Sequence, residues 1–377
     1  MTDAPRILVK APNWVGDCVM ATPALALLRK CLPEATIDVL ARPSVAGVFR
    51  CNPDINALLD IDERAMPAEA RAVIRENNYD AVAIMPNSLG SAWLVFRLWI
   101  GKRIGYARGG RGLLLTHPLR YDQYEWQTCT PEPLSKRAIR PKSSDTQRVP
   151  GHMVEYYLHI AEGTLAALGR SRRPDPHDEP GPLVLNVQTE AAVHVDQLLA
   201  APGLAGKTLI GINPGAAYGG AKRWPPDRLA ETASRLAELH GAAIVSTESI
   251  KEAELNEQVA AAARTTIHRL GEQLDLQGLI ALVDRLALLV TNDSGAMHIA
   301  AARAIPTLAI FGPTDWNVTR PWDCNAQVMR CSPGCAPCFL RDCPIDHRCM
   351  NSVGVDDVVR ACGHMLGNAH ARGTHAS

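Results

Sequence analysis

The chain has 377 residues, 47% of them hydrophobic and 21% charged, with 39 basic and 39 acidic side chains. This length favours two domains of about 150 to 200 residues, and the composition is that of an ordinary globular protein. The zero net charge provides no global field for nucleic acid, so we exclude a nucleic-acid partner.

The first half alternates between strand-like and helix-like patterns. Apolar runs predict strands at residues 7–10, 36–41 and 80–85, and apolar residues at helical spacing predict helices over 17–31 and 153–168. Such alternation is typical of a parallel, doubly wound sheet. The pattern degrades after Gly112, and residues 121–150 form a polar stretch.

A second alternating series follows residues 170–182, which hold four prolines and have the composition of a linker. It predicts strands at 208–213, 242–246, 286–290 and 306–311, and helices at 226–240, 252–263, 277–284 and 296–303. We therefore predict an α/β protein with two Rossmann-like domains facing across a cleft. The expected bounds are 1–175 and 183–352, and a C-terminal helix with a tail, frayed after Gly363, occupies 353–377.

The start of the chain lacks the layout of a signal peptide, and its longest apolar runs are interrupted well short of the roughly 20 residues of a transmembrane helix. A cytoplasmic protein is expected. Residues 97–148 nevertheless carry eleven basic and four acidic residues. Two interpretations of this basic segment stay open: contact with an anionic substrate or membrane surface, and a solvated loop face.

The most informative motif follows the strand at 286–290. The run Thr291-Asn-Asp-Ser-Gly295 leads into a helix that carries His298 in its first turn. The free N–H groups and the dipole of a helix N-terminus favour an anion, usually phosphate. Asp293 beside that anion suggests that sugar hydroxyls bind there too.

A glycine-rich loop follows the strand at 208–213 and ends in Lys222 and Arg223. Its spacing differs by one residue from a Walker phosphate loop, and Arg223 stands where that loop needs a hydroxyl, so an ordinary P-loop NTPase is excluded. Lys222 and Arg223 alone fit either a solvated helix start or a phosphate contact. Two phosphate-compatible loops in one half favour a nucleotide diphosphate.

Asp17 lies between the first strand and the first helix, directly after Gly16. An N-cap is one interpretation, since Asp caps helices often. A general base that takes a proton from an attacking hydroxyl is the other. The sequence leaves both open, and the two roles are compatible.

Five cysteines crowd into residues 331–349. Cys335-Ala-Pro-Cys338 with Cys343 and Cys349 offers a four-sulfur set for structural Zn or Fe, with Cys331 as a substitute ligand. Free thiols and disulfides are the alternatives that remain open.

Six segments in order and in register resemble the ADP-heptose:lipopolysaccharide heptosyltransferases of glycosyltransferase family 9, heptosyltransferase II type in particular. They are Trp14-Val-Gly-Asp17, Pro86-Asn-Ser88, Arg103-Ile-Gly-Tyr106, Lys222-Arg-Trp-Pro225, Thr291-Asn-Asp-Ser-Gly295 with His298, and Phe311-Gly-Pro-Thr314. The resemblance implies a GT-B fold and inverting transfer of L-glycero-D-manno-heptose from ADP-heptose to the anionic inner core of lipopolysaccharide. It also brings the inner membrane into consideration as a peripheral contact.

The resemblance assigns roles to particular residues. Asp17 becomes the catalytic base, and Lys222 the phosphate-binding lysine. The expected donor-binding set is Gly215, Lys222, Arg223, Glu252, Thr291, Asp293, Ser294, Gly295 and His298. The expected acceptor-binding set, which also rests on the basic segment, is Asn87, Ser88, Ser91 and Arg103. For His298, helix packing remains the alternative.

Lys222 and a helix N-terminus can stabilise the charge of a departing diphosphate in place of a divalent ion. We therefore expect catalysis without a metal or other cofactor, and interpret Asp60-Ile-Asp62 as surface acidity. One departure concerns Val245-Ser-Thr247, where the family often has Phe-Gly-Gly or Phe-Gly-Ser; Glu252 and Glu254 compete there for the ribose. The remaining alternatives are a transferase that uses another acceptor, including protein, or another nucleotide sugar, and a non-catalytic nucleotide-sugar-binding protein.

Overall fold

The computed structural model describes residues 4–62, 66–124, 126, 149–170, 181–322 and 325–373. These residues form two compact units, the first ending at Asn186 and the second beginning at Val187. Most of the predicted linker, residues 171–180, and much of the basic segment, residues 127–148, lie outside the described residues.

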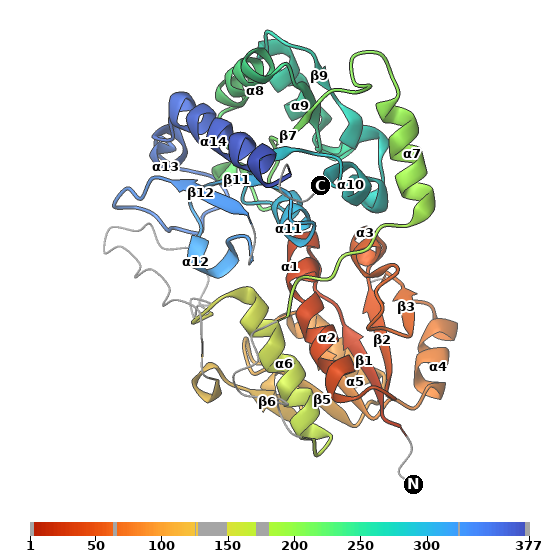
Figure 1. Ribbon diagram of the computed structural model, residues 1–377. Helices are drawn as coiled ribbons and strands as arrows, with labels where there is room; N and C mark the ends of the chain where they lie inside the picture. Colours follow the sequence, from red (N-terminus) through yellow and green to blue (C-terminus); the bar gives the residue numbers. More distant parts are fainter. Residues whose placement is uncertain are drawn as a thin grey trace. The chain divides into compact units, whose positions relative to one another are not determined.

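The first unit is built on a six-stranded sheet in which every neighbouring pair is parallel. The strand order is β3-β2-β1-β4-β5-β6, so the order reverses between β1 and β4. Figure 1 shows β2 and β3 on one side of β1, and β5 and β6 on the other. Loops that follow these two strands lie at a topological switch point, where doubly wound sheets bind ligands. The strands are β1 (Arg6–Lys10), β2 (Thr36–Ala41), β3 (Ala57–Asp60), β4 (Ala81–Ile84), β5 (Lys102–Tyr106) and β6 (His117–Leu119).

Helices connect these strands. They are α1 (Val15–Met20), α2 (Thr22–Cys31), α3 (Pro43–Ala46), α4 (Ala68–Glu76), α5 (Leu89–Arg97) and α6 (Met153–Ala167), with short 3-10 turns η1 (Gly47–Phe49), η2 (Arg111–Leu114) and η3 (Tyr121–Gln123). The helix predicted over residues 17–31 is two helices separated at Ala21. Pro23 near the start of α2 explains the break, because proline is tolerated in a first turn and not in a helix interior.

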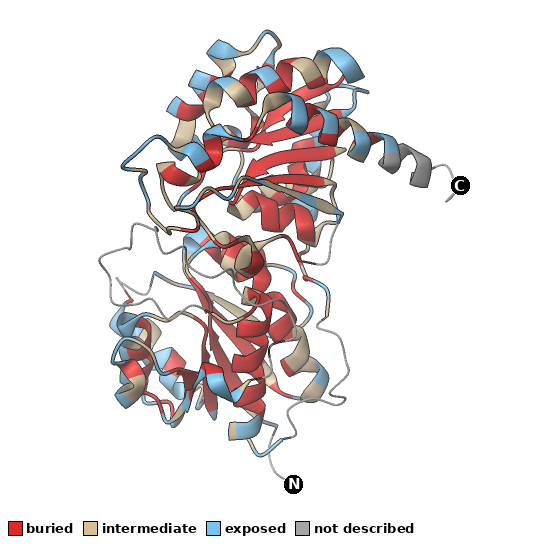
Figure 2. Cartoon of the chain, turned by 90° about the vertical axis from the view of Figure 1, so that its left-hand side faces the viewer, coloured by how far each residue is buried: buried red, intermediate tan, exposed pale blue. Residues whose placement is uncertain are grey.

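The second unit repeats this topology. Its parallel sheet has the order β12-β11-β10-β7-β8-β9, and the order reverses between β10 and β7. The central strands of both sheets are buried, as Figure 2 shows. The strands are β7 (Leu209–Asn213), β8 (Ala243–Ser246), β9 (Ile267–His268), β10 (Leu288–Asn292), β11 (Thr307–Phe311) and β12 (Ala326–Arg330).

The helices of the second unit are α7 (Thr189–Leu199), α8 (Pro226–His240), α9 (Ala253–Ala262), α10 (Leu276–Val283), α11 (Gly295–Ala302), α12 (Trp316–Thr319), α13 (Arg348–Asn351) and α14 (Val355–Gly373), with 3-10 turns η4 (Gly220–Lys222), η5 (Ile250–Glu252) and η6 (Leu270–Gln273). The expectation of fraying after Gly363 was wrong, because α14 continues to Gly373. Its buried Val358, Cys362 and Leu366 recur at helical spacing and join the core of the unit.

The predicted α/β class with two Rossmann-like sheets is confirmed. The sequence did not predict β3, β5, β6, β9 and β12, which lie toward the sheet edges and have two to five residues each. Strands this short carry little alternation to detect. None of the helices in the described part of the chain combines the length and the apolar composition that crossing a membrane requires.

Candidate functional site

Two loops of the second unit meet at its switch point. The loop after β7 carries Lys222 and the loop after β10 carries Asp293, and these two strands are neighbours in the sheet. Lys222 Nζ donates to Asp293 Oδ2 at 2.5 Å, and Thr314 Oγ1 donates to the same oxygen at 2.7 Å. Only 12% of the Lys222 side chain and 6% of the Asp293 side chain are exposed. The sequence motifs that suggested phosphate and sugar therefore do converge.

Asn292 holds the two loops together. Its Nδ2 donates to the carbonyl of Pro214 at 2.8 Å, and its Oδ1 accepts from the N–H of Trp224 at 3.0 Å. These bonds reach the start and the end of the glycine-rich loop, so Asn292 fixes the position of Lys222 between them. Asn292 belongs to the motif Thr291–Gly295, but this role was not predicted from the sequence.

The N-terminus of α11 lies beside this ion pair. Ser294 is its N-cap residue, but the Ser294 side chain does not cap the helix and instead shares a 3.0 Å hydrogen bond with Thr291 Oγ1. The N–H groups of the first turn are thus left for an anion, together with the positive end of the helix dipole. Thr291 itself is 1% exposed, and its bond to Ser294 stabilises the turn from the interior of the unit.

His298 is buried at 3% exposure within α11, and its Nδ1 atom has no hydrogen-bond partner among the described residues. Burial lowers its pKa to about 4, with Asp293 opposing and Lys222 adding to the shift. The imidazole is therefore neutral near pH 7 and supplies no positive charge to an anion. Its unpartnered nitrogen still leaves a role in hydrogen bonding.

Two carboxylates crowd around Gly215. A Cβ atom at this position would lie 1.8 Å from Glu248 Oε2 and 2.0 Å from Glu252 Oε2, so any other residue would displace both carboxylates. Glu252 accepts from Arg223 Nη2 at 2.6 Å, which places three predicted donor residues together. Burial, followed by the charge of Glu252, raises the pKa of Glu248 to about 7.

The sequence analysis missed Glu248 and weighed Glu252 against Glu254. Glu254 is exposed on α9, whereas Glu248 is the second residue after β8 and accepts from Asn213 Nδ2 at 3.2 Å. An acid so soon after a strand of the series was the available signal, because parallel strands present their carboxyl ends at the ligand-binding edge.

A second cation that sequence reasoning missed contacts the same tyrosine ring as Lys222. Lys222 Nζ is 5.0 Å and the Arg341 guanidinium carbon 5.5 Å from the centre of the Tyr218 ring. The carbonyl of Arg341 accepts from the N–H of Ala221 at 2.8 Å, and a Cβ on Gly219 would lie 2.4 Å from that carbonyl oxygen. The segment that follows β12 therefore packs tightly on the Lys222 loop.

In the first unit, Asp17 lies near the switch point between β1 and β4. The N-cap interpretation was wrong: Trp14 is the N-cap of α1, and Asp17 belongs to the first turn. The buried Tyr157 of α6 donates a hydrogen bond to Asp17, and its own pKa is raised by burial and then by the Asp17 charge. Asp17 remains partly accessible to solvent. It is thus a partly exposed carboxylate that a buried tyrosine orients.

The expected acceptor residues fall into two groups. Asn87 follows β4, and its Oδ1 accepts from Tyr156 at 2.7 Å and from Arg111 Nη2 at 3.1 Å. Ser88 is the N-cap of α5 and accepts from the N–H of Ser91 at 3.1 Å. These three residues lie together near the switch point.

Arg103 is used differently. Its guanidinium donates to the main-chain carbonyls of Leu114 and Ile100, each at 2.7 Å. That pattern closes a loop, and the structure does not bring Arg103 to the Asn87 group. The arginine beside Asn87 is the fully buried Arg111, which also donates to the carbonyls of Tyr106, at 2.7 Å, and Pro86. Burial lowers the pKa of Arg111.

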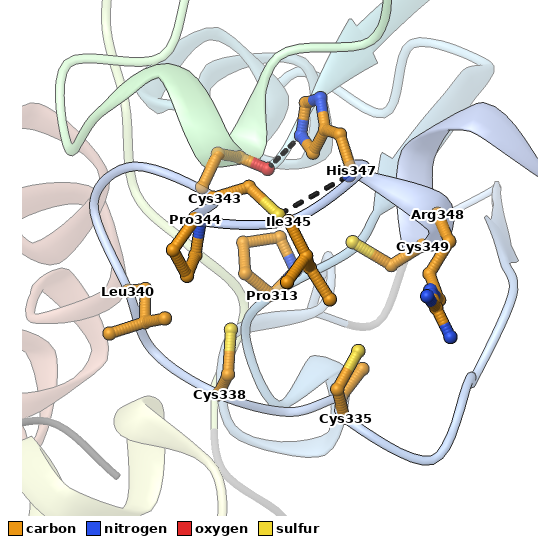
Figure 3. A pocket seen from close by; sticks show the side chains of 12 residues that line it. Pro313, Cys335, Cys338, Leu340, Cys343, Pro344, Ile345, His347, Arg348 and Cys349 are labelled. Atoms are coloured by element: carbon orange, nitrogen blue, oxygen red, sulfur yellow. Dashed lines mark hydrogen bonds between the residues drawn. The ribbon is translucent and has the colours of Figure 1, made fainter. Parts of the chain in front are cut away.

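The four cysteines of the predicted metal set surround one small pocket of about 20 Å³, which Figure 3 shows. They are free thiols. Cys343 accepts from the N–H of His347 at 3.3 Å, and burial, followed by the neighbouring sulfurs, raises the pKa of Cys349 to about 11. No three His, Cys, Asp or Glu side chains within the described ranges are arranged as ligands of one metal ion. The set is gathered as predicted, but not at ligand spacing.

Two Rossmann-like units, each built on a parallel six-stranded sheet, are the architecture of the GT-B glycosyltransferases. A family comparison agrees. Residues 69–130 and 143–348 match the model of "Glycosyltransferase family 9 (heptosyltransferase)", and the chain belongs to this family.

Individual relatives span nearly the whole chain. It is 30% identical over 342 residues to lipopolysaccharide heptosyltransferase 2 of Salmonella typhimurium, covering 87% of this chain and 89% of the relative. It is 24% identical over 369 residues to lipooligosaccharide heptosyltransferase 2 of Campylobacter jejuni, covering 97% and 99%. Among solved structures, ADP-heptose lipopolysaccharide heptosyltransferase II of Escherichia coli superposes with a TM-score of 0.76 at 26% identity, covering 97% and 99%.

Proposed function

We propose that this glycosyltransferase moves L-glycero-D-manno-heptose from ADP-heptose to the inner core of lipopolysaccharide, with inversion at the anomeric carbon. The observation that carries the proposal is the Lys222–Asp293 pair at the switch point of the second sheet. Family membership supplies the reaction class. In this reaction an acceptor hydroxyl attacks the anomeric carbon, and ADP leaves with the bonding electrons.

The second unit would hold the donor. Lys222 and the first-turn amides of α11, beginning at Ser294 and Gly295, would stabilise the charge that develops on the departing diphosphate. Asp293 would accept from sugar hydroxyls, while Glu248 and Glu252 suit the ribose hydroxyls at the end of β8. Because Asp293 neutralises Lys222, Arg341 is well placed to add positive charge. We propose that these groups act without a divalent ion.

The first unit would supply the base. Tyr157 orients Asp17 by donating to its carboxylate, and this partly exposed carboxylate would take the acceptor proton. Asn87 and Ser88 at the neighbouring loop are suited to acceptor hydroxyls, and the basic surface of this unit suits an anionic acceptor. We propose that the protein acts on this acceptor at the cytoplasmic face of the inner membrane.

The decisive experiment is transfer by Asp17→Asn with ADP-heptose and a heptose-deficient core oligosaccharide, followed by mass spectrometry. Loss of a general base lowers the rate by about 10²- to 10⁴-fold, while binding of ADP should stay normal. Asp60→Asn is the matched control, because Asp60 ends β3 and pairs with Arg50. Undiminished transfer by Asp17→Asn sinks the base assignment.

Two alternatives have distinct signatures. A relative that modifies another acceptor would add a heptosyl mass to protein and leave the core oligosaccharide unchanged. A non-catalytic binding protein would bind ADP and transfer heptose to neither. UDP- and GDP-sugars offered beside ADP-heptose test the choice of nucleotide.

The structural Zn or Fe predicted on the cysteine set stays a prediction. A bound ion would have to draw the four thiols closer together than the structure shows. Elemental analysis of the purified protein decides it: one equivalent of Zn or Fe that is lost in Cys338→Ser supports the site, and a metal-free, fully folded protein rejects it.

A further inference from the structure

One face of α5 is apolar and open to solvent. Leu89, Trp93 and Phe96 stand at positions i, i+4 and i+7 of the helix and are 56%, 51% and 43% exposed. Trp99, just beyond the helix, is 81% exposed, and Leu113 of the adjacent η2 is 95% exposed. We call these five residues the α5 patch. Scattered single exposed apolar residues are normal, but a cluster of this kind marks an interaction site.

The α5 patch is not needed to build the core. The opposite face of α5, with Ala92 and Val95 at 0% exposure, packs on the sheet. The rings of Trp93 and Phe96 stack on each other at 5.7 Å. Trp99 has a φ of +61°, a backbone region that bulky residues rarely adopt. Such local strain is typical of functional positions.

Three arginines, Arg75, Arg97 and Arg103, lie beside the patch, and we call them its basic rim. Arg97 is exposed at the end of α5, and Arg75 from α4 donates to its carbonyl at 2.7 Å. The guanidinium carbon of Arg103 lies 5.4 Å from the centre of the Phe96 ring. The sequence between Asp80 and Asp122 contains no acidic residue, and five of its basic residues, all but the buried Arg111, are at least partly exposed: Arg97, Lys102, Arg103, Arg108 and Arg120.

We propose that the α5 patch docks on an anionic lipid bilayer. Tryptophan and other apolar side chains would enter the headgroup boundary, and the basic rim would meet the lipid phosphates. A second copy of the chain fits less well, because a symmetric contact through this patch would place two basic rims against each other. The α5 patch would be the surface that holds the protein at the membrane, the location given in the proposed function. Lipid binding by this patch does not depend on the identity of the donor or the acceptor.

The test is flotation of the full-length protein with vesicles. One set contains phosphatidylglycerol and phosphatidylethanolamine, and the other contains phosphatidylcholine alone. We expect the wild type to float with the anionic vesicles, and Trp93→Ser combined with Trp99→Ser to lower the partition coefficient about tenfold or more. Leu239→Ser is the matched control, since Leu239 is a 65% exposed apolar residue of α8.

Arg97→Glu separates the electrostatic from the apolar contribution. It should weaken binding to anionic vesicles at low salt, because one member of the rim then carries a negative charge. Raising the salt concentration should lower the binding of the wild type more than that of Arg97→Glu, because salt screens the attraction of the basic rim to the lipid. Binding to phosphatidylcholine should stay weak in both proteins.

Three outcomes overturn the proposal. The first is a wild-type protein that does not bind anionic vesicles, and the second is a double tryptophan variant that binds them as well as the wild type does. The third is a wild-type protein that sediments as a dimer and does not bind vesicles, while the double variant sediments as a monomer. Heptose transfer to soluble, delipidated core oligosaccharide is measured in parallel. If that transfer fails in the wild type, the proposed function fails, whereas the vesicle result still decides the docking surface.

Discussion

Replacing Lys222 by Met tests the centre of the donor site through both stability and binding. The Lys222–Asp293 pair is nearly buried, at 12% and 6% exposure, and Met would leave Asp293 with Thr314 as its remaining named partner. Removing one member of a buried pair costs about 3 kcal/mol or more. For a unit of this size that free energy corresponds to a fall in Tm of about 6 to 12 °C.

The same change should weaken the binding of ADP. A charge-assisted hydrogen bond contributes about 1.5 to 3 kcal/mol, so the Kd should rise about 10- to 150-fold. Calorimetric unfolding gives the Tm, and isothermal titration with ADP gives the Kd. Lys207→Met is the matched control, because Lys207 is an exposed lysine of the same unit.

The two measurements separate two roles of Lys222. A lower Tm with unchanged ADP affinity would mean that Lys222 only neutralises Asp293 and does not bind phosphate. Unchanged Tm and unchanged affinity together would refute the ion pair as well as the donor assignment. Asp293→Asn gives the converse case: it frees Lys222, so ADP should bind at least as well while transfer of the sugar is lost.

Three further predictions concern the same unit. Gly215→Ala should lower the free energy of unfolding by about 1 to 3 kcal/mol, because its Cβ would lie 1.8 Å from a Glu248 oxygen. Gly367→Ala is the control, since open space surrounds Gly367. Equal melting curves for the two variants would contradict this prediction. Because the folded-state pKa of Glu248 is raised to about 7, the native state binds the proton more tightly than the unfolded chain, and stability should fall by up to on the order of 3 kcal/mol as pH rises from about 4.5 through 7. Glu248→Gln should remove that slope from urea unfolding curves, and an unaltered slope would assign it to another group. Arg341→Ala should raise the Kd of ADP about tenfold and the Kd of AMP much less, and Arg360→Ala is the control. An equal rise in the Kd of both nucleotides would argue against a contact between Arg341 and the second phosphate.

The sequence located the candidate site residues of the second unit better than those of the first. Lys222 and Asp293 were predictable together because each follows a buried strand, and the order of such strands places β7 beside β10. Glu248 escaped detection because the direction of a side chain in the loop after β8 depends on the contacts of that loop. Its carboxylate is set by Asn213, Gly215 and Ser249, which no spacing rule connects.

In the first half, the basic segment hid a buried arginine. Arg111 looks like one more surface cation in the sequence, but the carbonyls of Pro86 and Tyr106 and the amide of Asn87 satisfy its guanidinium inside the unit. Arg103, expected near the acceptor, is instead used by loop carbonyls. Composition fixes the sign of a surface, and tertiary hydrogen bonds decide which cations remain on it.

The two units place their predicted groups by one topological device. In each sheet the strand order reverses between the first and the fourth strand of the unit, and the loops after those strands diverge to opposite faces of the sheet. Asp17 and Asn87 follow β1 and β4, while Lys222 and Asp293 follow β7 and β10. Lys222 and Asp293, 71 positions apart in sequence, are thereby brought to the same edge of their sheet, where they form an ion pair. It follows that substitutions in the cores of these strands should alter stability with little effect on specificity, whereas changes in the four loops should alter donor and acceptor choice on an unchanged fold.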